Sequence, residues 1–209
     1  MGAHFTLSYD TREFPLAAMA AAALGVEDLQ ELPDRVRAGR PPAERDAPLT
    51  YEDNLALRSV LTELPFDHEL PSLYRRLILD FIAPRFGGHI SHTRSATWRV
   101  QMAHSPGVSA WHRDADITGR PDYLTVWLPF VDTEGANTLW VETDYGTGEH
   151  APIAVHHGEI LFFDGAMLEH GSVANTTDVT RVSMDFRIVP RPVDEGGPGD
   201  RGVFAGRPG

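Results

Sequence analysis

The sequence predicts one mainly β domain with antiparallel strands, preceded by a helical N-terminal part. Two patterns support this fold class. Hydrophobic residues recur at helical spacing through the first 86 residues and then alternate every second residue. From Thr97 onward, short apolar runs follow one another, each bounded by Gly, Pro, Asp or Asn, with no helices between them. Such a succession of short strands favours an antiparallel sandwich or barrel.

The helical part, residues 1–90, divides into four segments. Residues 13–31 carry an alanine-rich helical pattern, 33–50 are proline-rich without an apolar period, and 51–64 are helical again. We therefore expect residues 33–50 to be a loop or lid. A last helix, 70–86, ends at a glycine pair, and its apolar stripe must pack on a sheet; the stripe is Leu73, Leu77, Ile78, Phe81 and Ile82.

The strands are predicted from the alternating part of the chain. They are Thr97–Ala103, Tyr123–Val131, Thr138–Glu142, Ile153–Val155, Glu159–Phe163 and Val179–Val189. From Arg181 the last strand has polar residues at odd positions and apolar residues at even positions. Because strand side chains alternate between faces, the even face matches the helical stripe and the odd face points into the barrel.

Length and composition indicate a single domain over residues 1–189. Residues 190–209 contain six Gly and four Pro with little to bury, so we expect a disordered tail. No apolar run approaches the roughly 20 residues of a membrane-spanning helix, which favours a cytoplasmic chain with no membrane partner. The pattern does not specify an oligomeric state.

Charge and cysteine content exclude several functional classes. Thirty acidic residues against 18 basic ones leave a net charge of -12, which disfavours binding to nucleic acid or anionic lipid. The absence of cysteine excludes thiolate zinc sites, iron–sulfur clusters and cysteine nucleophiles. Any metal site must therefore use His, Asp or Glu.

Two histidines and one carboxylate form a candidate metal site. In an extended segment, His112 and Asp114 project to the same side and can reach one point. His170, which follows a strand and a short turn, can supply a third ligand. Two His and one carboxylate leave positions open on an octahedral metal, which suits non-haem Fe(II) that must hold other molecules. The same three ligands also fit a zinc hydrolase or a cupin.

A buried arginine gives a second indication. Arg181 lies eleven residues after His170, and Ser183 lies beside it on the inward face of the last strand. A guanidinium inside a barrel requires an anion, and its planar fork suits a carboxylate, with the serine hydroxyl as a further donor. The alternative is a buried ion pair between Arg181 and Asp185.

In their order and spacing, these five residues resemble the Fe(II)/2-oxoglutarate-dependent dioxygenases. The family pattern is His-x-Asp, a distal His, and Arg-x-Ser about ten residues later. The segment LTVWLPFVDTEGANTLWVE, followed by GTGEH, resembles the phytanoyl-CoA hydroxylase branch, and more closely its bacterial members from antibiotic biosynthesis. The resemblance covers residues 95–190 and implies a double-stranded β-helix, a cupin-like jelly roll, with helices on its major sheet.

The resemblance also implies the roles of individual residues. His112, Asp114 and His170 would bind Fe(II), and Arg181 with Ser183 would bind the distal carboxylate of the co-substrate 2-oxoglutarate. Trp127 and Gln101 are further candidates for contacting 2-oxoglutarate. Three arginines expected near the mouth of the barrel could receive a substrate carboxylate: Arg94, Arg99 and Arg113.

The implied reaction uses dioxygen (O2), hydroxylates a small molecule or otherwise oxidises an unactivated C–H bond in it, and releases succinate and CO2. An amino acid or a natural-product intermediate is the expected substrate. Two alternatives remain at this point: a cupin-type metal hydrolase or isomerase, and a non-catalytic jelly roll that binds a small molecule.

Overall fold

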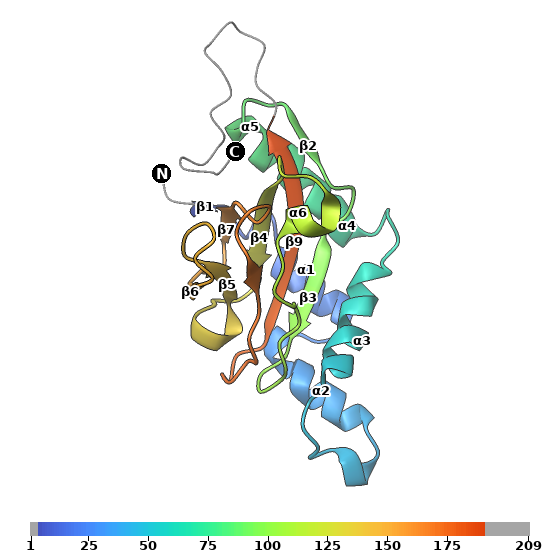
Figure 1. The fold of residues 1–209 in the computed structure, drawn as a ribbon. Coiled ribbons are helices and arrows are strands. Elements are labelled where there is room, and N and C mark those ends of the chain that lie inside the picture. The colour runs from blue at the N-terminus through green and yellow to red at the C-terminus, as the bar shows by residue number, and fades with distance from the viewer. Residues whose placement is uncertain (1–3, 191–209) are drawn as a thin grey trace, which may run out of the picture.

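A computed structural model describes residues 4–190, and the chain folds into strands flanked by helices (Figure 1). Apart from Pro190, the tail predicted over 190–209 lies outside the described residues. The helices are α1 (Leu16–Leu24), α2 (Leu32–Gly39), α3 (Tyr51–Thr62), α4 (Glu69–Arg76), α5 (Ala83–Arg85) and α6 (Asp114–Thr118). The strands are β1 (His4–Ser8), β2 (Ile90–His92), β3 (Thr97–Gln101), β4 (Leu124–Pro129), β5 (Leu139–Glu142), β6 (His150–Ile153), β7 (Glu159–Phe163), β8 (His170–Gly171) and β9 (Arg181–Pro190).

The larger sheet is built around the ten-residue strand β9. Within residues 4–190 its order is β1-β7-β4-β9-β2, and β3 pairs with β9 as well. β4 runs antiparallel along one edge of β9, with Trp127 opposite Asp185, and β3 runs along the other edge, with Gln101 opposite Arg181. β9 therefore touches three neighbouring strands and lies at the centre of the sheet.

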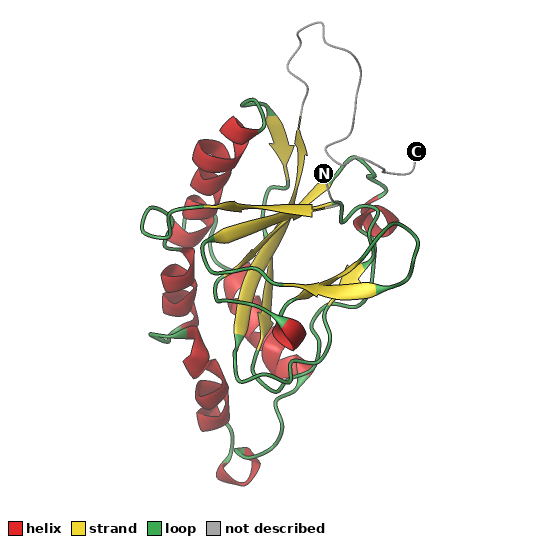
Figure 2. Cartoon of the chain, turned by 90° about the vertical axis from the view of Figure 1, so that its left-hand side faces the viewer, coloured by secondary structure: helices red, strands yellow, loops and turns green. Residues whose placement is uncertain are grey.

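A smaller sheet, ordered β6-β5-β8 in the described part of the chain, faces the inner side of the larger one. Figure 2 shows the two sheets with most of the helices stacked along the outer side of the larger sheet. This arrangement is the mainly antiparallel jelly roll with N-terminal helices that the sequence predicts.

Two hydrophobic clusters hold these layers together. The first lies between the helices and the outer face of the larger sheet, where even-numbered β9 residues such as Phe186 meet α4; the Tyr74 and Phe186 ring centroids are 5.1 Å apart. The second lies between the sheets and contains Trp127, Val141 and Phe163. The alternation along β9 therefore packs as predicted, with its apolar side against the helical stripe.

Several predicted boundaries need correction. Residues 33–50 are not simply a loop, because α2 runs to Gly39 with Pro33 in its first turn, where a missing backbone N–H costs no hydrogen bond. The helix predicted over 13–31 ends at Leu24, where Gly25 takes a left-handed conformation with φ 70°. The helix predicted over 70–86 contains a π-helical stretch, Leu77–Ile82.

Four strands differ from prediction by more than their end residues. β1 is an edge strand that pairs with β7, β2 pairs with the end of β9, and β8 pairs with β5; none of these three was predicted. β6 was predicted over Ile153–Val155 but spans His150–Ile153, because its pairing with β5 runs from Ile153 opposite Leu139 back to His150 opposite Glu142. Among the described residues, no helix is long and apolar enough to cross a membrane.

The N-terminus of α3 gives a first test of the fold. Thr50 Oγ1 accepts a hydrogen bond from Asp53 N (3.2 Å), Asp53 Oδ2 accepts one from Thr50 N (2.7 Å), and Arg40 Nη2 lies 2.5 Å from the same carboxylate. Partial burial raises the pKa of Asp53, but these hydrogen bonds and the Arg40 charge outweigh it and hold the pKa below its usual value. The charged form of Asp53 thus stabilises the fold.

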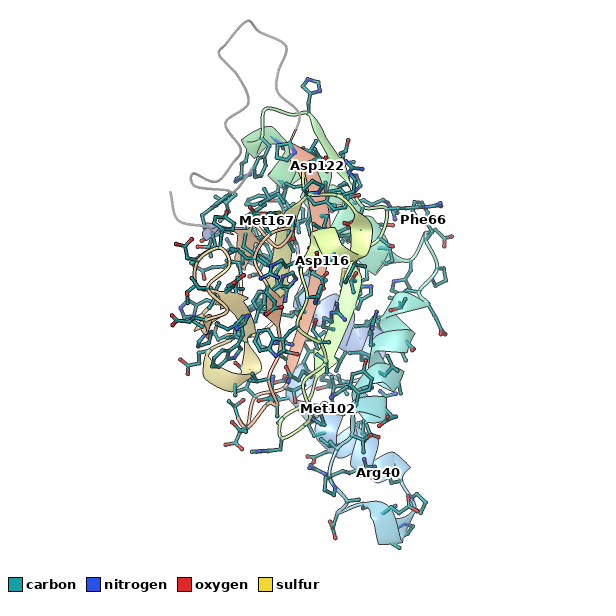
Figure 3. All side chains as sticks on the ribbon, in the orientation of Figure 1. Arg40, Phe66, Met102, Asp116, Asp122 and Met167 are labelled. Carbon is teal, nitrogen blue, oxygen red and sulfur yellow. The ribbon has the colours of Figure 1, made fainter. Side chains whose placement is uncertain are left out.

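We expect Asp53→Asn to lower the free energy of unfolding at pH 7 by about 1 kcal/mol, as for loss of a helix cap. A carboxyl with a lowered folded-state pKa stabilises above its unfolded pKa, and this contribution is lost as pH falls through the folded pKa. The difference between variant and wild type in urea unfolding should therefore shrink below about pH 4. A difference that stays constant down to pH 2 would contradict this account. The Arg40–Asp53 contact lies at the end of the molecule that carries α2, where Arg40 is labelled in Figure 3.

Candidate metal and co-substrate site

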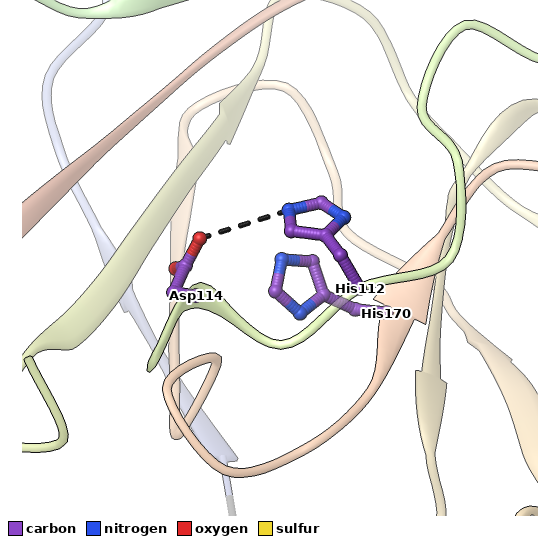
Figure 4. A group of neighbouring side chains, drawn as sticks. All are labelled: His112, Asp114 and His170. Carbon is purple, nitrogen blue, oxygen red and sulfur yellow. Dashed lines mark ion pairs between the residues drawn. The ribbon is translucent and has the colours of Figure 1, made fainter. Parts of the chain in front are cut away.

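His112, Asp114 and His170 come together on the inner side of the larger sheet (Figure 4). His112 and His170 form an antiparallel bridge, with His112 N donating to His170 O (3.1 Å) and His170 N donating to His112 O (2.9 Å). Asp114 follows as the first residue of α6, after an extended Arg113. One potential ligand atom from each residue lies within 4.8 Å of the others, a spacing that one metal ion can bridge.

Both imidazole rings are held in the same way. His112 Nδ1 is 2.8 Å from Ala110 O, and His170 Nδ1 is 3.0 Å from Leu168 O. We assign the proton to Nδ1 in each ring, since only a protonated nitrogen can donate to a carbonyl, and this leaves the Nε2 lone pairs for a metal. Burial lowers the pKa of His170 to about 4, so this ring is neutral at pH 7.

The Asp114 carboxylate is buried and surrounded by donors. Thr125 Oγ1 donates to Oδ2 (2.6 Å), Arg187 Nε donates to the same oxygen (2.9 Å), and Arg187 Nη2 contacts Oδ1. Burial alone would raise the pKa of Asp114, but His112 and Arg187 outweigh it and hold the pKa far below its usual value. Asp114 is therefore an anionic ligand candidate, and its Oδ1 lies 3.7 Å from His112 Nε2.

Arg181 projects from β9 into the space between the sheets and is 2% exposed. Its Nη1 donates to Asn137 O (3.0 Å), and its guanidinium carbon lies 5.8 Å from the centre of the Trp127 ring. Neither Arg181 Nε nor Ser183 Oγ has a hydrogen-bond partner among the described residues. Burial, and then the neighbouring charge of Arg99, lowers the pKa of Arg181 to about 9, so it still carries a charge at pH 7.

The alternative explanation of Arg181, an ion pair with Asp185, is wrong. Asp185 Oδ2 is 2.6 Å from Arg187 Nη1, and Asp185 Oδ1 is 3.4 Å from Arg99 Nε. No ion pair joins Asp185 to Arg181 within residues 4–190. The structure thus contains a buried guanidinium without an acidic partner, which is costly unless an anion binds there.

One open cavity brings most of these features together; its empty space of about 360 Å³ includes solvent at its mouth. It is lined by Arg99, Ser109, His112, Thr125, Trp127, Leu139, Phe163, His170, Arg181, Asp185 and Arg187. None of residues 33–50, predicted to be a loop or lid, is among these lining residues of the described chain. Two of the predicted metal ligands, His112 and His170, and the predicted anion-binding Arg181 therefore open into the same space, while Asp114 lies behind it and contacts the lining residues Thr125 and Arg187.

Trp127 and Gln101, the two other residues predicted to contact 2-oxoglutarate, differ in their position relative to the cavity. Trp127 lines the cavity. Gln101 is fully buried and lies opposite Arg181 in the β3–β9 pairing. Its Nε2 donates to Val173 O (2.7 Å) and Pro106 O (3.3 Å), and it is not among the residues that line the cavity. Its Oε1 has no partner within the described residues. Contact of either residue with 2-oxoglutarate stays a prediction.

Of the three arginines expected at the mouth, Arg99 lines the cavity. Arg113 points elsewhere, with Nε donating to Met167 O (2.9 Å) and Nη2 to Glu142 Oε2 (2.9 Å). Arg94 lies 5.4 Å from the Phe66 ring centre. Two residues of the site, Thr125 and Arg187, were not predicted, although Arg187 lies on the odd-numbered, polar face of β9 with Arg181 and Ser183.

Comparison with known proteins places this geometry in context. No family model matches the chain. Among solved structures, it is similar to EctD from S. alaskensis, determined with 2-oxoglutarate and 5-hydroxyectoine (TM-score 0.55, 16% identity, 98% of this chain and 82% of that chain). It is also similar to a nickel complex of the non-heme monooxygenase ThoJ (TM-score 0.54, 21% identity, 90% and 74%). These two likenesses establish the fold.

Sequence similarity decides the family. The chain is 32% identical over 203 residues to the streptomycin biosynthesis protein StrG of Streptomyces griseus, covering 96% of this chain and 91% of StrG. The chain belongs to the protein family that contains StrG. Its fold is that of the Fe(II)/2-oxoglutarate-dependent oxygenases; of the two similar structures, ThoJ was determined with nickel and EctD with 2-oxoglutarate.

The residues of this chain fit a non-haem metal and 2-oxoglutarate. Two imidazoles held through Nδ1, with Nε2 directed toward the cluster, and one ionised carboxylate are the donor set of a non-haem iron site with open positions. Arg181, which lines the cavity, and Ser183, two residues later on the same face of β9, each have a buried polar atom without a partner in the described chain, as expected where a carboxylate binds. The chemistry of the donors therefore matches both the metal and the keto acid.

Proposed function

We propose that this chain is an Fe(II)/2-oxoglutarate-dependent oxygenase that hydroxylates a small-molecule intermediate of natural-product biosynthesis. The observation that carries the proposal is the common cavity, because it joins His112 and His170 of the His-Asp-His cluster to a buried guanidinium that has no ion-pair partner within residues 4–190. Fe(II) with 2-oxoglutarate and O2 supplies the oxidising power: one oxygen atom goes to succinate, CO2 leaves, and the other oxygen replaces a C–H bond of the substrate by C–OH.

The chain's own residues bind and orient these groups. His112, His170 and Asp114 would hold the metal, while Arg187 and Thr125 hold the Asp114 carboxylate in place. Arg181 would pair with the distal carboxylate of 2-oxoglutarate, and Ser183 Oγ would donate a further hydrogen bond to it. Trp127, Leu139 and Phe163 form apolar walls that exclude water from this end of the cavity.

The remaining lining indicates the substrate class. Arg99, Asp185 and Arg187 form a connected row of charges along the same cavity. A polar small molecule with charged groups, such as an amino acid or a natural-product intermediate, fits such a lining better than a protein or nucleic acid. The similarity to StrG, named for streptomycin biosynthesis, supports a natural-product substrate.

The proposal is tested first without a substrate. Under anaerobic conditions, the wild-type protein with Fe(II) and 2-oxoglutarate should develop the visible metal-to-ligand charge-transfer absorption of a chelated keto acid. Succinate, which has two carboxylates but no keto group, is the control ligand and should give no band. Bound iron without the band would reject the proposal and favour a cupin-type metal enzyme.

Hydroxylation is tested by a substrate screen. Candidates are scored by succinate release, and a true substrate should gain one oxygen atom derived from labelled O2. Desaturation, cyclisation or epimerisation would instead release succinate with no oxygen gained by the product. That result would retain the oxygenase and reject hydroxylation.

A further inference from the structure

We propose that Glu142 positions the metal ligands, by tying together the two chain segments that carry them. The proposal rests on the metal site proposed above and assigns a role to a residue outside the cavity. Glu142 ends β5, and its side chain is completely buried. It lies behind the His-Asp-His cluster and lines no part of the cavity in the described chain.

Glu142 binds the segment before His170. Its Oε2 accepts a hydrogen bond from Glu169 N (3.1 Å), and its backbone N donates to Glu169 O (2.8 Å). The β5–β8 pairing places Val141 opposite His170, so this contact is adjacent to the metal ligand itself. Gly148 N also donates to Glu142 Oε1 (2.8 Å) and fixes the second oxygen.

The same carboxylate binds the segment that carries the other two ligands. Arg113 lies between His112 and Asp114, and its Nη2 donates to Glu142 Oε2 (2.9 Å). The backbone of Arg113 is extended, with φ −105° and ψ 137°, so its side chain points away from the side on which His112 and Asp114 lie. Arg113 Nε further donates to Met167 O (2.9 Å), on the segment leading to His170.

These contacts fix the relative positions of the metal ligands more than they stabilise the fold. A buried ion pair gains little net stability over an apolar pair of similar volume, because both charges lose their hydration. A metal site, however, depends on the relative position of its ligands, and residues that orient ligands affect metal affinity strongly. Backbone hydrogen bonds also join the two segments, at the His112–His170 bridge and from Asp114 N to Gly165 O (2.8 Å). The Arg113–Glu142 pair adds a side-chain contact to them, so its loss should loosen the ligand geometry without separating the segments.

The test is a titration of Co(II) into the full chain, followed by its visible absorption. Glu142→Gln keeps the size of the side chain, removes its charge and places an amide against hydrogen-bond donors. We expect about 10- to 100-fold weaker Co(II) binding and an altered Co(II) spectrum, as for other residues that orient ligands. Arg113→Lys should lose less affinity than Arg113→Gln, because it retains the positive charge.

Two further variants separate positioning from general stability. Asp53→Asn breaks a partly buried ion pair far from the site and should bind Co(II) like the wild type despite its lower stability. The double variant Glu142→Gln/Arg113→Gln should lose less Co(II) affinity than the product of the two single losses, since the two changes share one interaction, the Arg113–Glu142 pair.

Wild-type affinity and spectrum in Glu142→Gln would overturn the proposal, as would an equal loss of affinity in Asp53→Asn. If Glu142→Gln does not fold, Arg113→Gln decides, because Arg113 is partly exposed and its loss leaves no cavity. Failure of the wild type to bind Co(II) would reject both the metal site and this role. Normal Co(II) binding without the 2-oxoglutarate band would reject only the proposed function.

Discussion

Asp114→Asn is expected to weaken metal binding by more than about 100-fold, beyond the range seen when a residue that merely orients ligands is lost. Asparagine keeps the shape of the side chain but removes its charge, and the low pKa of Asp114 means that the charge is present throughout the physiological range. His170→Ala should have an effect of the same size, because it removes a buried neutral ring. Turnover should be lost with the metal in both variants.

The control for this prediction is Asp116→Asn. Asp116 lies on the same short helix α6, two residues after Asp114, and its side chain is exposed (Figure 3). Metal titration and circular dichroism of the three variants separate ligand loss from unfolding. Wild-type metal affinity in a folded Asp114→Asn would remove Asp114 from the site.

Arg181→Ala should raise the 2-oxoglutarate requirement by about 10- to 150-fold, since hydrogen bonds to charged groups contribute about 1.5–3 kcal/mol and 1.4 kcal/mol is a factor of ten. Metal affinity without 2-oxoglutarate should stay unchanged, because Arg181 contacts none of the three ligands. This pattern is the opposite of that expected for Asp114→Asn. The 2-oxoglutarate requirement of Arg181→Lys should fall between those of the wild type and Arg181→Ala, since lysine keeps the charge but loses the planar fork.

The measurement is the dependence of the anaerobic absorption band on 2-oxoglutarate concentration. Arg94→Ala, which removes an exposed arginine outside the cavity, is the matched control and should follow the wild-type curve. A cupin-type hydrolase has no use for a carboxylate at this position. An unchanged curve in Arg181→Ala would therefore favour that alternative.

Local sequence patterns predicted much of the fold, and they predicted that the His112, Asp114 and His170 side chains lie close together. The His-x-Asp spacing works because Arg113 is extended, and the two faces of β9 follow from the strict alternation of Arg181–Ile188. Pro33 shows where such patterns mislead, since a proline that breaks a helix interior is favourable in its first turn. The edge strand β1 was not predicted because a run of five residues is too short to identify as a strand from its sequence alone, and its pairing partner β7 lies far away in the chain.

The contacts around the cluster depend on pairings far apart in the sequence. Glu142 ends an ordinary apolar strand, and only the fold brings it to Arg113, 29 residues earlier. Asp185 lies four residues after Arg181 and two before Arg187, and alternation places all three on one face. Which arginine it pairs with depends on side-chain geometry that spacing does not encode. The choice of Arg187 leaves Arg181 available for a ligand.

Strand β9 carries the core on one face and the charged lining of the cavity on the other. Inserting or deleting a single residue near its start would exchange the faces, placing Arg181 and Ser183 in the core and Val182 and Met184 in the cavity. Such changes should be eliminated by selection, whereas point substitutions at odd positions leave the core intact. Relatives with new substrates should therefore differ from this chain by replacements along a strand of constant length, and laboratory evolution of specificity should target the same positions.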